Sequence, residues 1–130
     1  MALALTIDGS TVHDIASLYV ELDRVLMPDE DWRLGESLDA LDDLLYGGFG
    51  VLHGQDDVHV TWADHAVSRA ALGVEATRAW YQAKLDRPEV YASGPAERAL
   101  AALDAGTGPT YFDLVLEVFA GHPEVRLTLA

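Results

Sequence analysis

Hydrophobic and polar residues follow patterns that change several times along the chain. Residues 3 to 7 alternate weakly and end at the turn pair Asp8-Gly9, which predicts a short strand. From Asp14 onward, apolar residues recur every three or four positions, so we expect a helix with one buried face that ends before Pro28. The residues of this face are Ile15, Leu18, Tyr19, Leu22, Val25 and Leu26.

A second helical pattern follows a polar, acidic stretch. Ser37 stands where an N-cap residue is expected, and Gly47 is placed to end the helix. Between them, Leu38, Leu41 and Leu45 form the apolar face. The glycines after this helix lack the spacing of a phosphate-binding loop, so they are interpreted as a helix end and a turn.

The middle of the chain changes character twice. Residues 57 to 62 alternate and are rich in β-branched and aromatic side chains, which predicts a strand. Residues 63 to 109 contain more alanine and carry two helical patterns, at 74 to 85 and 95 to 106, so this stretch is interpreted as a helical insertion.

The C-terminal part repeats the order of helix and strand. Thr110 and Asp113 have the spacing of a capping box, and an apolar face continues to Gly121. Residues 125 to 129 form the last predicted strand. Three strands separated by helices predict one α/β domain over residues 1 to 130, with a three-stranded parallel sheet and right-handed helical crossovers.

Composition narrows the class of protein further. The 130 residues are 50% hydrophobic and contain no cysteine, which excludes a disulfide scaffold, a thiolate metal site and a cysteine nucleophile. No apolar run is long enough to span a membrane, and no secretory signal is present, so we expect a cytoplasmic protein. The net charge of −14 repels nucleic acid and anionic lipid and attracts basic partners.

The acidic charge is concentrated at one place. Residues 29 to 43 contain seven acidic residues and one arginine. Asp39 and Asp43 lie one helical turn apart, with Glu36 and Asp42 beside them. Two interpretations stay open, a solvated helix surface or a docking surface for a cationic partner, and the repulsion between like charges favours the second.

Other chemistry finds little support in the sequence. His53, His59 and His65 are six residues apart, a spacing that suits neither a helix face nor neighbouring metal ligands. No nucleophile elbow or serine-histidine-aspartate grouping is evident. We therefore expect no cofactor and no metal, and an enzyme ranks below a binding protein.

The segment Gly35-Glu36-Ser37-Leu38-Asp39-Ala40-Leu41, followed by Asp43 and Gly47, resembles the signature of the barstar family. These small intracellular proteins inhibit barnase-type ribonucleases. Residues 58 to 62 and 115 to 119 are similar to the family's second strand and last helix. The resemblance covers roughly residues 3 to 62 and 114 to 130 and leaves the insertion uncovered.

The resemblance implies a barstar-like fold and an acidic helix that blocks a ribonuclease active site by mimicking RNA phosphates. Asp39 and Asp43 match the two aspartates of the motif, and Asp43 matches the dominant anchor. The partner-binding residues predicted in this way are Asp39, Asp43, Asp42, Glu36, Trp32 and Gly47.

The sequence also departs from the family pattern. Asp42 replaces an aromatic residue, and Arg33 and Leu34 replace two tyrosines, which leaves Trp32 as the candidate for their stacking role. The last helix stops before the positions of two interface glutamates. These differences favour a basic ribonuclease toxin other than barnase as the partner, with a non-nuclease partner of a barstar-fold interaction module as the alternative.

Overall fold

The computed structural model describes residues 3–91 and 93–130 and contains one three-stranded sheet. Its strands are β1 (Leu3–Asp8), β2 (Val58–Ala63) and β3 (Val125–Leu129), and they lie in the order β1-β2-β3. Both pairings are parallel, as the sequence predicts. Val60 of the central strand lies between Leu5 and Leu127.

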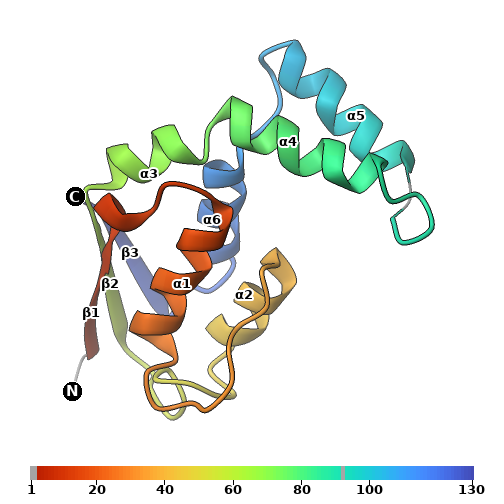
Figure 1. The fold of residues 1–130 in the computed structure, drawn as a ribbon. Helices are drawn as coiled ribbons and strands as arrows, with labels where there is room; N and C mark the ends of the chain where they lie inside the picture. The colour runs from red at the N-terminus through yellow and green to blue at the C-terminus, as the bar shows by residue number, and fades with distance from the viewer. Residues whose placement is uncertain (1–2, 92) are drawn as a thin grey trace.

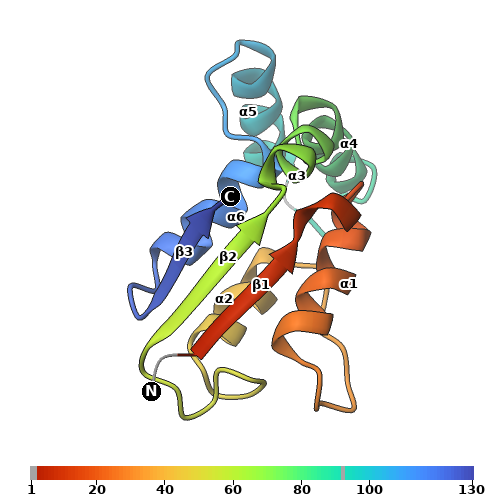
Figure 2. The ribbon, with the colours of Figure 1, turned by 90° about the vertical axis from the view of Figure 1, so that its left-hand side faces the viewer.

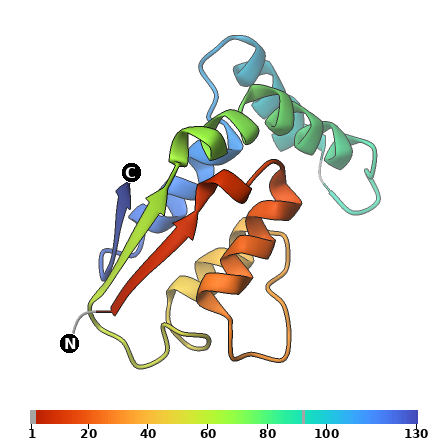
Figure 3. The ribbon, with the colours of Figure 1, turned by 60° about the vertical axis from the view of Figure 1, so that its left-hand side comes forward.

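The helices are arranged on one face and one end of this sheet. Helices α1, α2 and α6 cover one face, whereas the other face is open (Figure 1, Figure 2). Helices α3, α4 and α5 follow one another beyond the carboxyl end of β2 (Figure 3). The bounds are η1 Gly9–Thr11, α1 Ile15–Leu26, α2 Leu38–Leu45, α3 His65–Ala71, α4 Val74–Leu85, α5 Ser93–Asp104 and α6 Tyr111–Ala120.

The hydrophobic core lies between the sheet and the three covering helices. In β2 the buried residues Val58, Val60 and Trp62 alternate with partly exposed residues of the open face. Phe112 of α6 packs against Trp62, with ring centroids 5.1 Å apart. Alternation along a strand therefore does separate a buried face from an open one, as the sequence pattern indicates.

Two predicted helix starts are confirmed at the level of hydrogen bonds. The side chain of Ser37 accepts a hydrogen bond from the Ala40 amide at the start of α2. Thr110 and Asp113 form a capping box at the start of α6. Such caps satisfy backbone amides that have no partner within the helix.

The segment 63–109 contains three helices, whereas the sequence analysis predicts two. Helix α3 was missed because its seven residues are too few to show a helical stripe. Ser68 in this helix is fully buried; its hydroxyl donates to the Gly9 carbonyl and accepts from the Trp62 indole. Leu72 is also fully buried. The first part of the segment therefore belongs to the core.

The second part of the segment is a helical hairpin that projects from the rest of the molecule (Figure 1). Helix α5 packs on α4 and buries Ala96 and Leu103. Trp80 of α4 connects the hairpin to the core, because its ring meets the Tyr111 ring edge to face at 4.8 Å.

Candidate partner-binding surface

The acidic segment forms a loop followed by α2, and two carboxylates hold the loop in place. Asp23 of α1 accepts a hydrogen bond from the amide of Leu34, whose side chain is buried. Glu30 accepts a hydrogen bond from the Gly50 amide at 3.0 Å. The loop is thus fixed at both ends before the chain enters α2.

Helix α2 separates an apolar side from an acidic side. Leu41, Leu44 and Leu45 are buried, which fixes the rotation of the helix about its axis. Asp39 and Asp43 are exposed one turn apart. Within residues 3–91 and 93–130, neither carboxylate forms a side-chain hydrogen bond or an ion pair.

Asp42 lies on another side of α2 and has a partner in the fold. His122, just after α6, donates a hydrogen bond from Nε2 to Asp42 Oδ1 at 2.6 Å. The histidine side chain is 3% exposed, and Glu124 approaches its Nδ1 at 3.6 Å. The Tyr46 ring contacts the same imidazole edge to face. Asp42 thus has a structural role, which the sequence analysis did not find.

Glu36 lies near a buried pair of tyrosines. The hydroxyls of Tyr19 and Tyr111 are hydrogen-bonded at 2.6 Å. Burial raises the pKa of both side chains, and the negative charge of Glu36 adds to this effect. The neutral, protonated form of the pair is therefore favoured in the folded protein.

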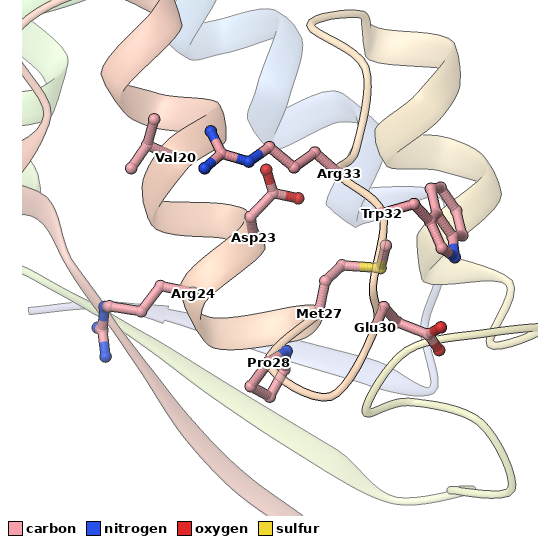
Figure 4. Close-up of a pocket in the computed structure, with 8 residues that line it drawn as sticks. All are labelled: Val20, Asp23, Arg24, Met27, Pro28, Glu30, Trp32 and Arg33. Carbon is pink, nitrogen blue, oxygen red and sulfur yellow. The ribbon is translucent and has the colours of Figure 1, made fainter.

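Trp32 packs on the segment that follows α2. It is 47% exposed, and its ring packs against Phe49 at 5.0 Å. It lines a hollow of about 430 Å³ between α1 and the loop. Figure 4 shows its ring pointing away from α1. In the same view the Arg33 side chain extends back toward Val20, above Asp23.

Gly47 has a conformational role at the end of α2. Its φ angle is +82°, a region that suits glycine, and its amide donates to the Leu44 carbonyl at 3.0 Å. Gly50 is more tightly constrained, because a Cβ there would lie 2.6 Å from the Leu26 carbonyl oxygen. These glycines turn the chain from α2 toward β2, as predicted.

Three of the six residues predicted as the site line hollows of the surface, Trp32 one hollow and Glu36 and Asp39 another. Glu36 and Asp39 line a hollow of about 290 Å³ together with Trp80, Lys84 and Tyr91. Asp43 is exposed one turn further along α2 and lines neither this hollow nor the one beside Trp32. The sequence analysis does not place Trp80, Lys84 and Tyr91 beside the start of α2, because sequence spacing does not reveal that the hairpin reaches this helix.

Among the described residues, no three or more histidine and acidic side chains gather in a way that could hold a metal ion. In the same part of the chain, no helix is both long and apolar enough to cross a membrane. No protein-family model matches the sequence, and a search of the curated proteins finds no match either.

Proposed function

We propose that this protein is a barstar-like cytoplasmic inhibitor, or immunity protein, that blocks the active site of a basic ribonuclease with the acidic side of α2. The binding residues are Asp39 and Asp43. The proposal assigns the chain no catalytic step and no cofactor.

The proposal rests on one observation, the exposure of Asp39 and Asp43 without side-chain partners. Both are exposed on a short helix that is held by three buried leucines, and neither has a side-chain partner among the described residues. Like charges one turn apart weaken an isolated helix by a few tenths of a kcal/mol, about 0.2–0.5. A cationic partner would remove this repulsion and provide the missing ion pairs.

The proposed mechanism follows from charge and rigidity. A ribonuclease binds RNA phosphates with arginine, lysine and histidine side chains, and carboxylates can occupy the same positions. The net charge of −14 would accelerate the encounter with such a cationic cleft. Because the core already fixes α2, little conformational entropy would be lost on binding.

The arrangement of the fold also supports a barstar-like assignment. The chain has a three-stranded parallel sheet with α1, α2 and α6 on one face, and the motif resemblance falls at the start of α2. The hairpin of α4 and α5 has no counterpart in that resemblance. It favours a second candidate function, a barstar-fold interaction module whose non-nuclease partner binds through the hairpin.

Inhibition of purified ribonucleases tests the proposal. A panel of basic enzymes, barnase-type nucleases included, would be titrated with the parent, with Asp43→Ala and with Glu97→Ala. Glu97 is an exposed acid on α5, so its variant makes the same charge change away from α2. We expect stoichiometric inhibition of at least one enzyme by the parent and by Glu97→Ala, and weaker inhibition by Asp43→Ala.

Binding without inhibition would favour the interaction module instead. A partner captured on the immobilised chain would then be tested for binding to the parent and to Asp43→Ala. If that partner binds Asp43→Ala as well as the parent and is not a nuclease, the inhibitor proposal is wrong.

A further inference from the structure

The hollow beside Asp39 combines charged and aromatic surfaces from two distant parts of the chain. One side comes from the start of α2 and carries Glu36 and Asp39. The other side comes from the hairpin and carries Trp80, Lys84 and Tyr91. Figure 1 shows the N-terminal end of α2 pointing toward α4.

The aromatic side of the hollow already holds a cation of the chain itself. The Lys84 ammonium lies 4.1 Å from the centroid of the Trp80 ring and 5.3 Å from that of Tyr91. The Trp80 ring is fixed in turn by its neighbours, because its centroid lies 4.8 Å from the centroids of both the Tyr81 ring and the Tyr111 ring. The faces of the Trp80 and Tyr91 rings are thus arranged to receive a positive charge.

The acidic side of the hollow is not neutralised by this lysine. Among the described residues, no carboxylate oxygen lies within 4.0 Å of the Lys84 ammonium. Glu36 and Asp39 together carry two negative charges against one positive charge. A further cation would therefore gain electrostatic attraction as well as a ring surface.

Arginine fits this combination better than lysine does. A planar guanidinium can stack on an aromatic face while its N–H groups donate to a carboxylate, whereas an ammonium acts as a compact, strongly hydrated point charge. We infer that the hollow receives an arginine side chain of the partner protein, between the Trp80 and Tyr91 rings and the carboxylates of Glu36 and Asp39. Lys84 occupies the aromatic surface in the free protein and is displaced.

This inference rests on the proposed function only for the identity of the partner. The hollow itself can be tested with a defined probe, N-acetyl-arginine amide, by nuclear magnetic resonance on the full chain. N-acetyl-citrulline amide is the matched control, because it has a similar shape and no charge. Resonances of the Trp80 indole N–H and of the Glu36, Asp39 and Lys84 amides report on the hollow.

We expect saturable shifts of these resonances with the arginine probe and none with citrulline. Shifts that are equal for both probes, that lie elsewhere, or that do not appear would overturn the inference. Tyr91→Ala, a change at a 39% exposed side chain, should weaken binding of the arginine probe without affecting folding.

Lys84→Gln gives the sharpest result because it removes the competing cation. Affinity for the arginine probe should rise about two- to fivefold, the range of an exposed cation–π interaction. Arg98→Gln removes the same charge from an exposed position of α5 and should leave the affinity unchanged. An unchanged or lower affinity for Lys84→Gln would show that the lysine is part of the site and not its competitor.

Asp43→Ala separates this inference from the proposed function. Asp43 does not line the hollow, so its variant should bind the arginine probe like the parent even where it loses the ribonuclease. If the probe binds normally and the ribonuclease also binds Asp43→Ala normally, the proposed function fails and the arginine site stands. If the probe does not bind and Asp43→Ala loses the ribonuclease, the arginine site fails and the proposed function stands.

Discussion

Helices α1 and α2 both carry acidic side chains, but these side chains differ in burial and in their hydrogen-bond partners. In α1, Glu21 is 4% exposed, accepts a hydrogen bond from the Asp8 amide and binds Arg24 through both oxygens. In α2, Asp39 and Asp43 are exposed and have no side-chain partner among the described residues. The number of acids in a helix therefore does not indicate their role, whereas their partners do.

Asp42 is intermediate between these two groups. It belongs to α2, but its hydrogen bond to His122 connects α2 to the turn between α6 and β3. We therefore expect the free energy of unfolding to fall strongly when Glu21 is replaced and moderately when Asp42 is replaced. Replacement of Asp39 or Asp43 should hardly change it.

The largest effect on stability is expected at Glu21. In Glu21→Ala the Asp8 amide loses its acceptor in a partly buried place and Arg24 loses its partner, so the free energy of unfolding should fall by about 1–3 kcal/mol. Glu21→Gln keeps an acceptor and should lose less. Denaturant melts measure both, with Glu97→Ala as the exposed control. Equal stability of Glu21→Ala and the control would remove the distinction between the helices.

High pH tests another buried group of α1. The pKa of Tyr19 is raised above its ordinary value of 10.0, first by burial and then by its hydrogen bond to Tyr111. Protonated tyrosine is thus favoured by folding, and this stabilisation is complete below pH 10. Above that pH it falls by about 1.4 kcal/mol per pH unit for each tyrosine that stays protonated in the folded state.

Melts between pH 9 and 11 check this expectation, since about pH 10 is where exposed tyrosine titrates. The parent should lose stability over this range, and Tyr19→Phe should lose less. Tyr46→Phe, at a side chain that is 73% exposed, should behave like the parent. A flat profile in the parent would contradict the burial of the tyrosine pair.

A moderate effect is expected when Asp42 is replaced. Asp42→Ala leaves the buried His122 without its hydrogen-bond acceptor, and a loss of about 0.5–1.5 kcal/mol is expected because the aspartate is half exposed. Asp42→Asn keeps an acceptor oxygen and should lose less. Denaturant melts of both variants beside Asp43→Ala make the comparison within one helix. A smaller loss for Asp42→Ala than for Asp43→Ala would reverse the roles given to these neighbours.

The smallest effect on stability is expected for Asp43→Ala. This change removes a charge that repels Asp39 and leaves no group without a partner, so stability should stay equal or rise by about 0.2–0.5 kcal/mol. Thermal and denaturant melts measure it. A loss above about 1 kcal/mol, beyond the usual range for exposed positions, would place Asp43 among the structural carboxylates.

Much of the fold could be predicted because its signals are local. Ser37 and Thr110 act on amides three residues away, and the apolar stripes of α1 and α6 lie within single helices. The parallel sheet followed from strands separated by helices. Helix α3 was not predicted because it is short. Its packing depends on hydrogen bonds between Ser68 and two residues, Trp62 and Gly9, that lie 6 and 59 positions away in the sequence.

The candidate site was only partly predictable for the same reason. The exposure of Asp39 and Asp43 follows from the leucine stripe of α2. By contrast, the link from Asp42 to His122 spans 80 residues, and the link from Glu30 to Gly50 spans 20. The hollow beside Asp39 is likewise lined by residues from two distant segments, α2 and the hairpin. Such contacts are set by packing, which the sequence of either segment alone does not reveal.

The central claim is that the acidic side of α2 binds a basic partner. Its most direct test is the affinity of an inhibited ribonuclease for the parent, for Asp43→Ala and for Glu97→Ala, measured by stopped-flow association and dissociation. Removal of a carboxylate buried against partner cations should weaken binding by about 2–5 kcal/mol, mainly through faster dissociation, and Glu97→Ala should bind like the parent. If Asp43→Ala binds as tightly as the parent, Asp39 and Asp43 belong to a solvated helix surface and the account is wrong.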